Sequence, residues 1–599
     1  YRCDWSSDVC SSDLNYKINP NPLAHEWHIR LTFRQEHDLE TEISLPNWVP
    51  GSYLIRDFSR HITTIRAFCN GEYAHLTQVK KNRWRTAPQS GEWEIYYTVY
   101  AYDLSVRGSF LTAERGFFDG ACLFLQVNGQ ENGAHQIKFP ILPKTWRIAT
   151  TLPQTGIHSF QTTSYHDLID HPVELGNIEF LDFEAGGIPH RIALSGHYPD
   201  FDRDRFVSDI RTICETELAM FPSPAPFTHY LFLLHVGDNI YGGLEHISST
   251  ALLADRHSLP PHGMTEANDA YTQLLGLFSH EYFHAWNVKS IKPAAFAPYD
   301  LDRENYTEQL WAFEGITSYY DDLFLARSRT IAPEAYLRLL AQSITRVQQT
   351  KGRLKQSLAE SSFTAWNKFY KQDENSPNAI VSYYQKGALA ALCLDLAIRS
   401  KSSGRHTLDS VMQQHYRDWL ETRQGIPEKQ WQARCQAFTG LDLEDFFQTT
   451  LYTTADLPLA DLLATIGIGL QWQAQPRSHG GAFLPEPPTE TPAPASDFGA
   501  RFKQSSDHAT LTHVFNGGSA ENAALCPQDK IIAIDGYACT DLAAQWAQLP
   551  IGATARLHYF RTGILYVADI NVQAAEADTA VLYITDRELF ESWLYNDRV

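Results

Sequence analysis

The chain lacks any long apolar run. No stretch of its 599 residues approaches the roughly 20 apolar residues that a membrane-spanning helix needs. We therefore expect no integral membrane segment. The beginning of the sequence also lacks the basic-then-apolar pattern of a secretory signal peptide. Residues 1–14 resemble translated sequencing-adapter sequence, so we interpret them as an artefactual leader.

A surplus of positive charge is also lacking, because 49 Lys and Arg face 70 Asp and Glu and the net charge is −21. This acidity disfavours nucleic acid and anionic membrane surfaces as partners. The nine cysteines form no CxxC pair. Cys122, Cys214 and Cys393 lie in apolar patterns that predict buried free thiols, which favours a reducing compartment and a cytoplasmic location. Because the leader replaces the natural start, a periplasmic or secreted location stays open.

The run at 279–286 contains a His-Glu-x-x-His motif. Leucine and aromatic residues recur around it at helical spacing, which predicts a helix over 269–289. Residues four apart on a helix share one face, so His280 and His284 can direct two imidazoles at one zinc ion. Glu281 then lies beside them as the general base for a zinc-activated water.

A catalytic zinc needs a third protein ligand and an open position. Glu314 offers that ligand, because it lies among large apolar residues in the predicted helix 310–320. An unpaired carboxylate would be costly there, and metal ligation would remove the cost. A His-Glu-x-x-His motif also occurs by chance. A chance motif in a helix, followed by a buried carboxylate, is much rarer, so we predict one Zn²⁺ per chain.

The N-terminal part, 15–200, has the period of two that is typical of β-strands, as in Trp27, Ile29 and Leu31. Further strands are predicted at 121–127 and 135–142. We expect an all-β, sandwich-like domain. Its segment 46–58 is a turn-rich loop with an Arg-Asp pair. The simpler interpretation is a structural corner with an internal salt bridge, and the alternative is a wall of the active-site cleft.

From 201 to 460 the pattern changes to helices, interrupted by a predicted strand at 229–236 that leads into Gly242-Gly243-Leu244-Glu245. Two glycines beside a strand permit close approach of another backbone, so a peptide substrate can pair there as an added strand. Glu245 would then bind its α-ammonium group. The alternative is an ordinary strand-end turn with a solvated Glu. The zinc motif favours the binding role.

Two tyrosines, Tyr383 and Tyr384, begin another predicted helix, 382–394. A helix end can face a cleft, and a Tyr hydroxyl that donates to an oxyanion is a known catalytic device. Buried Tyr is common in protein cores, so spacing alone does not separate a catalytic Tyr from a packed one.

The composition turns Pro-rich at 473–497, which predicts a flexible linker or long loop. Strands return afterwards, and the run at 517–536 resembles a PDZ domain. We therefore predict a PDZ-like β domain over 461–575, with the Pro-rich stretch as an insertion and 466–472 as its first strand. Residues 576–599 would form a C-terminal tail.

Together these motifs resemble the glycyl-aminopeptidase-type zinc metallopeptidases, gluzincins with a thermolysin-like catalytic domain and a C-terminal PDZ domain. The resemblance covers nearly everything from 15 to 575. It rests on four blocks: Pro-x-Trp-x-Pro-Gly-Ser-Tyr-x-x-Arg-Asp at 46–57, Gly-Gly-Leu-Glu-His at 242–246, His-Glu-x-x-His-x-Trp-Asn at 280–287 and Leu-Trp-x-x-Glu-Gly at 310–315.

The resemblance implies a role for each site residue. The zinc ligands would be His280, His284 and Glu314, the general base Glu281, the substrate-binding residues Gly242, Gly243 and Glu245, and the oxyanion donor Tyr384 with Tyr383 as the alternative. It also implies a preference for small N-terminal residues, Gly or Ala.

The chain departs from the broader aminopeptidase pattern in three places. The 29 residues between His284 and Glu314 (285–313) imply an extra loop, 287–305, near the cleft. His246 stands where those enzymes have Asn. The carboxylate-binding loop of the PDZ-like domain has only one candidate, the segment 498–502.

We therefore predict a multidomain α+β protein with a mainly α, thermolysin-like catalytic domain over 201–460. Its predicted activity is that of a zinc aminopeptidase, with peptides as substrates and a peptide or protein as a further ligand of the PDZ-like domain. A zinc endopeptidase is the near alternative, since a loosely placed Glu245 would permit internal cleavage. A non-catalytic PDZ-containing peptide-binding protein is the alternative from another class, although intact ligands and Glu281 argue against it.

Overall fold

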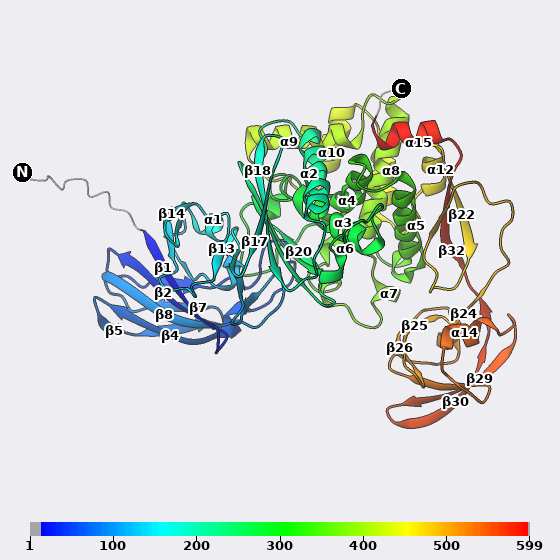
Figure 1. Cartoon of the computed structure of the whole chain (residues 1–599), viewed down its shortest axis with the longest axis horizontal. Helices are drawn as coiled ribbons and strands as arrows, with labels where there is room; N and C mark the ends of the chain where they lie inside the picture. The colour runs from blue at the N-terminus through cyan, green and yellow to red at the C-terminus, as the bar shows by residue number, and fades with distance from the viewer. Residues whose placement is uncertain (1–12, 597–599) are drawn as a thin grey trace, which may run out of the picture. The chain divides into compact units, whose positions relative to one another are not determined.

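The structure, a computed structural model, describes residues 13–596 and divides into two units (Figure 1). Unit 1 is Tyr1–Ile291 with Phe296–Asn305, and unit 2 is Lys292–Ala295 with Tyr306–Val599. Of the predicted leader, residues 1–12 lie outside the described residues, and Leu14 begins the first strand. Within 13–596, no helix combines the length and apolar character that a membrane span requires.

Three β-sheets form the N-terminal part of unit 1, which confirms a β-rich domain there. The largest sheet has the order β14 (Gln154–Gly156), β15 (Ser159–Thr162), β12 (His135–Lys138), β1 (Leu14–Asn21), β2 (Glu26–Gln35), β8 (Gly91–Tyr100), β4 (Ile62–Cys69) and β5 (Glu72–Ala74). Figure 1 shows its central strands side by side in blue. Alternate residues of β2 are buried, as the period of two predicts.

Two four-stranded sheets complete this β-rich part. One has the order β13 (Arg147–Ala149), β16 (Val173–Gly176), β10 (Arg115–Phe118) and β9 (Ser109–Leu111), and the other β11 (Gln126–Val127), β3 (Glu42–Ser44), β7 (Arg83–Thr86) and β6 (Leu76–Lys80). The predicted strand at 121–127 is wrong for its first part. A short 3₁₀ turn at Gly120–Cys122 begins there because the Asp119 side chain accepts from the Ala121 N–H.

A five-stranded sheet follows. Because its first strand begins at Glu179, the N-terminal β domain ends before 179 and not at the predicted residue 200. Its order is β17 (Glu179–Ala185), β18 (Ile188–Gly196), β19 (Tyr230–Gly237), β21 (Ser249–Asp255) and β20 (Gly242–Glu245). β18 pairs in parallel with β19, so 179–196 belongs to this sheet and not to the preceding β domain. β20 pairs antiparallel with β21 and is an edge strand.

Helices α1 (Tyr165–Ile169), α2 (Arg203–Met220) and α3 (Asp269–Phe283) also belong to unit 1. Asn268 begins α3 by accepting a hydrogen bond from the Tyr271 N–H. The predicted end of α3 at 289 is wrong, because the helix ends at Phe283. Beyond it the Lys289 N–H bonds to the His284 oxygen and His284 Nδ1 approaches the Asn287 oxygen, so the backbone turns back.

Unit 2 begins with helices, as predicted. They are η5, a π-helical turn (Trp311–Gly315), α4 (Ile316–Arg327), α5 (Pro333–Gln349), α6 (Leu358–Phe363), α7 (Ser376–Ala379), α8 (Gln385–Ser402), α9 (Leu408–Thr422), α10 (Gln430–Thr439), α11 (Glu444–Tyr452) and α12 (Leu459–Ala464). η5 packs closely on the start of α8, since a Cβ on Gly315 would lie 2.6 Å from the Cα of Gly387. Two glycines therefore permit this helix contact.

The C-terminal sheet of unit 2 contains β25 (Ala500–Gln504), β26 (Ala509–Val514), β27 (Lys530–Ile534), β29 (Thr554–Arg561) and β30 (Ile564–Asn571), with β28 (Tyr537–Ala538) paired to β27. Strands therefore do return after the Pro-rich stretch, and β25 overlaps the segment 498–502 that was predicted as a carboxylate-binding loop. The short helices α13 (Ser519–Asn522) and α14 (Leu542–Ala547) and the small pair β24 (Ser496–Asp497) and β31 (Gln573–Ala574) accompany them. An apolar core of their own lies between them.

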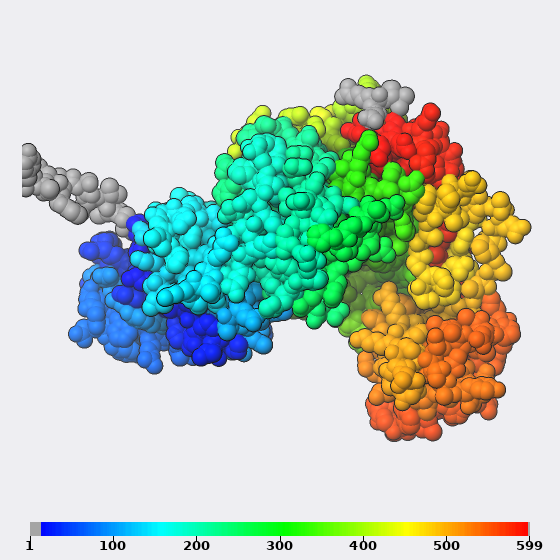
Figure 2. Space-filling view, in the orientation of Figure 1, coloured from blue at the N-terminus to red at the C-terminus, as the bar shows by residue number. Residues whose placement is uncertain are grey.

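The ends of this C-terminal region differ from the prediction. The segment predicted as the first PDZ strand forms β22 (Ile468–Ala474), which pairs with β32 (Ala577–Ile584) and not with the sheet of β25 to β30. The Pro-rich stretch contains β23 (Ala482–Leu484), also paired to β32. The predicted tail forms β32 and α15 (Arg587–Leu594), which Figure 2 shows in red on the surface of unit 2.

Gly481 allows the Pro-rich stretch to pack against α5. A Cβ there would lie 2.0 Å from the backbone oxygen of Ala341 in α5, so the chain lies directly on that helix. The seven cysteines among the described residues are all free, and six of them are buried. This confirms the prediction of buried free thiols.

Candidate active site

The two histidines of the motif lie at the end of α3. His280 is in its last turn and His284 caps it. Their Nε2 atoms are 3.1 Å apart. His284 Nδ1 lies 2.7 Å from the backbone oxygen of Asn287. Because a carbonyl oxygen only accepts, Nδ1 donates, and Nε2 of His284 presents its lone pair.

These side chains fit a metal ion. A hydrogen-bonded Nδ1 that fixes the tautomer is the usual support of a histidine ligand. Within unit 1, the ligand atoms of Glu245, Glu281 and His284 lie within 4.8 Å of one another. Glu314, the predicted third ligand beside His280 and His284, belongs to unit 2. Two imidazoles and a carboxylate are a donor set of catalytic zinc. The individual ligand assignments stay predictions.

Glu281 is buried against β20. A Cβ on Gly243 would lie 2.0 Å from Glu281 Oε1, so the carboxylate fills the space of a missing side chain. Burial raises the pKa of Glu281 to about 7, although His280 and His284 oppose the rise. Its Oε2 has no hydrogen-bond partner among the described residues. A buried carboxylate with a raised pKa and an open oxygen suits proton transfer.

Glu245 lies two residues after Gly243 in β20 and so on the same face. It is 4% exposed. No residue in the described part of the chain gives its carboxylate a hydrogen bond or an ion pair. A Cβ on Gly51, whose φ is +91°, would lie 2.5 Å from both carboxylate oxygens. Glu245 is therefore a buried carboxylate without a direct ion pair among the described residues, although Lys289 attracts it through space.

The loop 46–58 lies against Glu245 through Gly51, which supports its interpretation as a wall of the cleft. The internal salt bridge of the simpler interpretation is wrong, because Arg56 donates to Ser52 and Asp57 pairs with Lys81. The loop is also tied to the predicted extra loop, since Trp48 Nε1 donates to the backbone oxygen of Asp300 at 2.8 Å.

A buried charge network lies next to Glu245, and sequence reasoning missed most of it. Asp170 accepts from Lys289 Nζ at 2.6 Å and contacts His246 Nδ1 at 3.1 Å. Burial raises the pKa of Asp170, but Lys289 and His246 outweigh it and hold the pKa below its usual range. The network ties the end of β20 to the segment after α3. Lys289 could not have been predicted as a site residue, because its only link to the motif is that it lies nine residues after His280, and no sequence rule recognises that spacing.

Arg107 is a second residue that the sequence did not reveal. Its Nη2 donates to the backbone oxygen of Gly243 at 2.8 Å. It lies in an irregular segment between β8 and β9 with no periodic pattern. Only the fold brings it to β20.

The remaining predicted residues lie in unit 2. Glu314 is 2% exposed and sits in η5, a type of helical turn often found at functional sites. Tyr383 is fully buried, while Tyr384 is half-buried, with its hydroxyl 3.4 Å from that of Tyr370. Burial raises the pKa of Tyr383 well above its ordinary value, and Tyr370 and Glu314 add to the rise. Glu314 and Tyr383 are therefore electrostatic neighbours.

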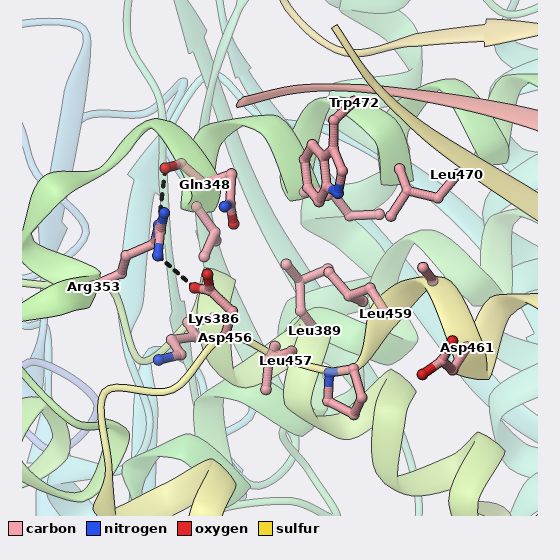
Figure 3. Close-up of a pocket in the computed structure, with 14 residues that line it drawn as sticks. Gln348, Arg353, Lys386, Leu389, Asp456, Leu457, Leu459, Asp461, Leu470 and Trp472 are labelled. Carbon is pink, nitrogen blue, oxygen red and sulfur yellow. Dashed lines mark hydrogen bonds and ion pairs between the residues drawn. The ribbon is translucent and has the colours of Figure 1, made fainter. Parts of the chain in front are cut away.

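A separate cavity of about 190 Å³ in unit 2 contains none of the predicted site residues. Figure 3 shows Arg353 held between Gln348 and Asp456 at its polar side, with Leu389 and Trp472 on the apolar side. Arg353 is thus already paired. This cavity does not belong to the candidate active site.

The comparisons with known proteins agree with the predicted chemistry. Residues 273–390 match the M61 glycyl aminopeptidase family, and 15–177 match the Peptidase M61 N-terminal domain. A crystal structure of an aminopeptidase N family protein from Idiomarina loihiensis is 39% identical with a TM-score of 0.92, covering 97% of this chain and 100% of that one. The chain belongs to the M61 glycyl aminopeptidase family.

More distant solved structures also match this M61 peptidase. An M1 zinc metallopeptidase from Deinococcus radiodurans is 13% identical with a TM-score of 0.46, over 75% of this chain and 95% of that one. Yeast LTA4 hydrolase with bestatin is 12% identical with a TM-score of 0.46, over 75% and 68%. The search of curated proteins found no match. The family match and the 39% identical relative confirm the predicted enzyme class: the chain is an aminopeptidase.

Proposed function

We propose that this M61 peptidase removes one residue at a time from the N-terminus of peptides, with Glu245 as the anchor of the substrate amine. The single observation that carries the proposal is the buried Glu245 carboxylate, which no described residue pairs. An α-ammonium group supplies the missing cation. An anchored amine fixes which peptide bond reaches the base, and so gives exopeptidase selectivity.

One Zn²⁺ would be held by His280, His284 and Glu314, and when bound it supplies Lewis-acid polarisation of the scissile carbonyl and of water. Glu281 takes a proton from the attacking water and delivers it to the leaving amine, so that one water is consumed and the C–N bond breaks. The half-buried Tyr384 is the better oxyanion donor, because the fully buried Tyr383 lies away from solvent.

Three finer assignments belong to the same proposal. The preference is for small N-terminal residues, Gly or Ala. The N-terminal β-rich part is a sandwich. The sheet of β25 to β30 is a PDZ-like module for a peptide or protein ligand, although Phe498 and Gly499 of the predicted carboxylate loop already accept backbone hydrogen bonds from Ala520 and Phe515.

The test compares a free Ala-initiated peptide with its N-acetylated twin, each with and without a zinc chelator. We expect chelator-sensitive hydrolysis of the free peptide only. Glu245→Ala should raise KM for the free peptide at least about tenfold, as expected for a lost charge-assisted contact. Equal cleavage of both peptides by the unmodified protein would make it an endopeptidase.

A further inference from the structure

Arg107 places a positive charge at β20. Its Nη2 holds the backbone oxygen of Gly243, and its Nη1 lies 3.6 Å from the position that a Cβ on Gly242 would take. Its guanidinium therefore lies within a few ångströms of the strand along which the proposed substrate binds.

The charge of Arg107 is not neutralised by a direct ion pair within the described part of the chain. Its Nε is buried without an acceptor. A partly buried guanidinium that has lost hydration without gaining a counter-ion is stabilised by a ligand anion. The planar fork of Arg matches a carboxylate in particular.

The proposed substrate orientation determines which part of the peptide lies beside Arg107. The amine lies at Glu245, and the reacting carbonyl lies beside Glu281, which is packed against Gly243. The peptide then runs antiparallel to β20, at about 3.3 Å per residue. The residue after the scissile bond then lies at the level of Leu244, and its carboxyl end reaches the level of Gly243, whose backbone oxygen accepts from Nη2 of Arg107. In a dipeptide that residue carries the free α-carboxylate.

We propose that Arg107 binds the free α-carboxylate of the leaving amino acid, which makes dipeptides the preferred substrate class. This inference rests on the proposed function, because the amine anchor at Glu245 sets the register. Arg107 would thereby act as a specificity-determining residue: Glu245 would bind the amine of the first substrate residue, and Arg107 would bind the carboxylate of the second. The peptide would be held at both of its charged ends.

The experiment measures kcat/KM for Ala-Ala and for Ala-Ala-amide, which lacks the carboxylate charge. The unmodified protein should cleave the acid about tenfold better than the amide, and Arg107→Met should abolish that ratio mainly through a higher KM for the acid. Arg107→Lys should restore part of the ratio, because it keeps the charge without the planar fork. Arg191→Met is the control, since Arg191 lies on β18 in a surface pair with Asp182.

The outcomes separate the possibilities. If Arg107→Met lowers kcat/KM for acid and amide by the same factor, Arg107 only holds β20 and the inference is wrong. If the unmodified protein prefers the amide or shows no preference, the inference is also wrong, while aminopeptidase activity on the amide keeps the proposed function. Cleavage of neither compound would overturn both.

Discussion

At the scale of single residues, the candidate site depends on two glycines as much as on its acidic side chains. The carboxylates of Glu245 and Glu281 occupy the space that Cβ atoms on Gly51 and Gly243 would need. Each glycine thus allows a buried acid to lie against backbone. Glu245 on β20 and Glu281 on α3 are the two acids for which we propose the roles of holding an amine and moving a proton.

Gly243→Ala tests this arrangement. The new Cβ would lie 2.0 Å from Glu281 Oε1, so the base must move. We expect kcat to fall more than about 100-fold, as for a misplacement of about 1 Å. Gly156→Ala on β14 is the control, since its Cβ would meet nothing closer than Ser159, at 3.7 Å. Equal losses in the two variants would contradict the packing argument.

At the scale of elements, the contact of η5 with α8 positions the predicted site residues of unit 2. The Cβ position of Gly315 lies 2.6 Å from the Cα of Gly387 and 2.8 Å from the backbone oxygen of Tyr383. The turn that carries Glu314 is therefore fixed against the start of the helix that follows Tyr384.

Gly315→Ala should separate η5 from α8. The cost is that of overpacking a close contact, about 1–3 kcal/mol in the free energy of unfolding. Denaturant unfolding measures it, and Tyr384-dependent turnover should fall in parallel. Gly480→Ala is the control, because its Cβ would meet only Gln342, at 3.7 Å. A Gly315→Ala protein as stable as this control would show that the two elements can move apart without cost.

At the scale of the whole molecule, several histidines are buried in their neutral form. Burial lowers the pKa of His190 to about 4 and that of His235 to about 3. It also lowers the pKa of His415 to about 3, and Arg434 adds to this shift. In the unfolded chain each titrates near its ordinary pKa of about 6.5. Below that pH the unfolded state binds more protons, so stability falls as the pH falls.

His415→Phe tests this dependence at one position. Both ring nitrogens of His415 lack hydrogen-bond partners among the described residues, and the ring lies 4.9 Å from that of Trp431, so an apolar ring can replace it. Between pH 8 and pH 5 the free energy of unfolding should fall by about 2 kcal/mol less in the variant than in the unmodified protein. Urea unfolding at the two pH values measures the difference. An equal pH dependence in both proteins would contradict a neutral buried His415.

The sequence by itself determined the parts of this protein whose signals are local. The period of two gave the strands of the N-terminal part, and the His-Glu-x-x-His spacing placed two imidazoles on one turn of α3, because backbone geometry relates neighbouring residues in a fixed way. The motif blocks likewise identified the M61 family. The sequence pattern predicted that α3 ends at 289, six residues beyond its end at Phe283, because the turn that follows depends on the hydrogen bond between His284 and the Asn287 oxygen.

Only the tertiary structure decided what depends on residues far apart in the chain. β22 pairs with β32 more than 100 residues later, and the predicted tail becomes part of unit 2. Arg107, Gly51 and Asp170 reach β20 from other elements, and no periodicity records such an approach. The charges around a buried site depend on these distant contacts, so Glu245 and Glu281 could be named from the sequence, but the nearby Lys289 and Arg107 could not.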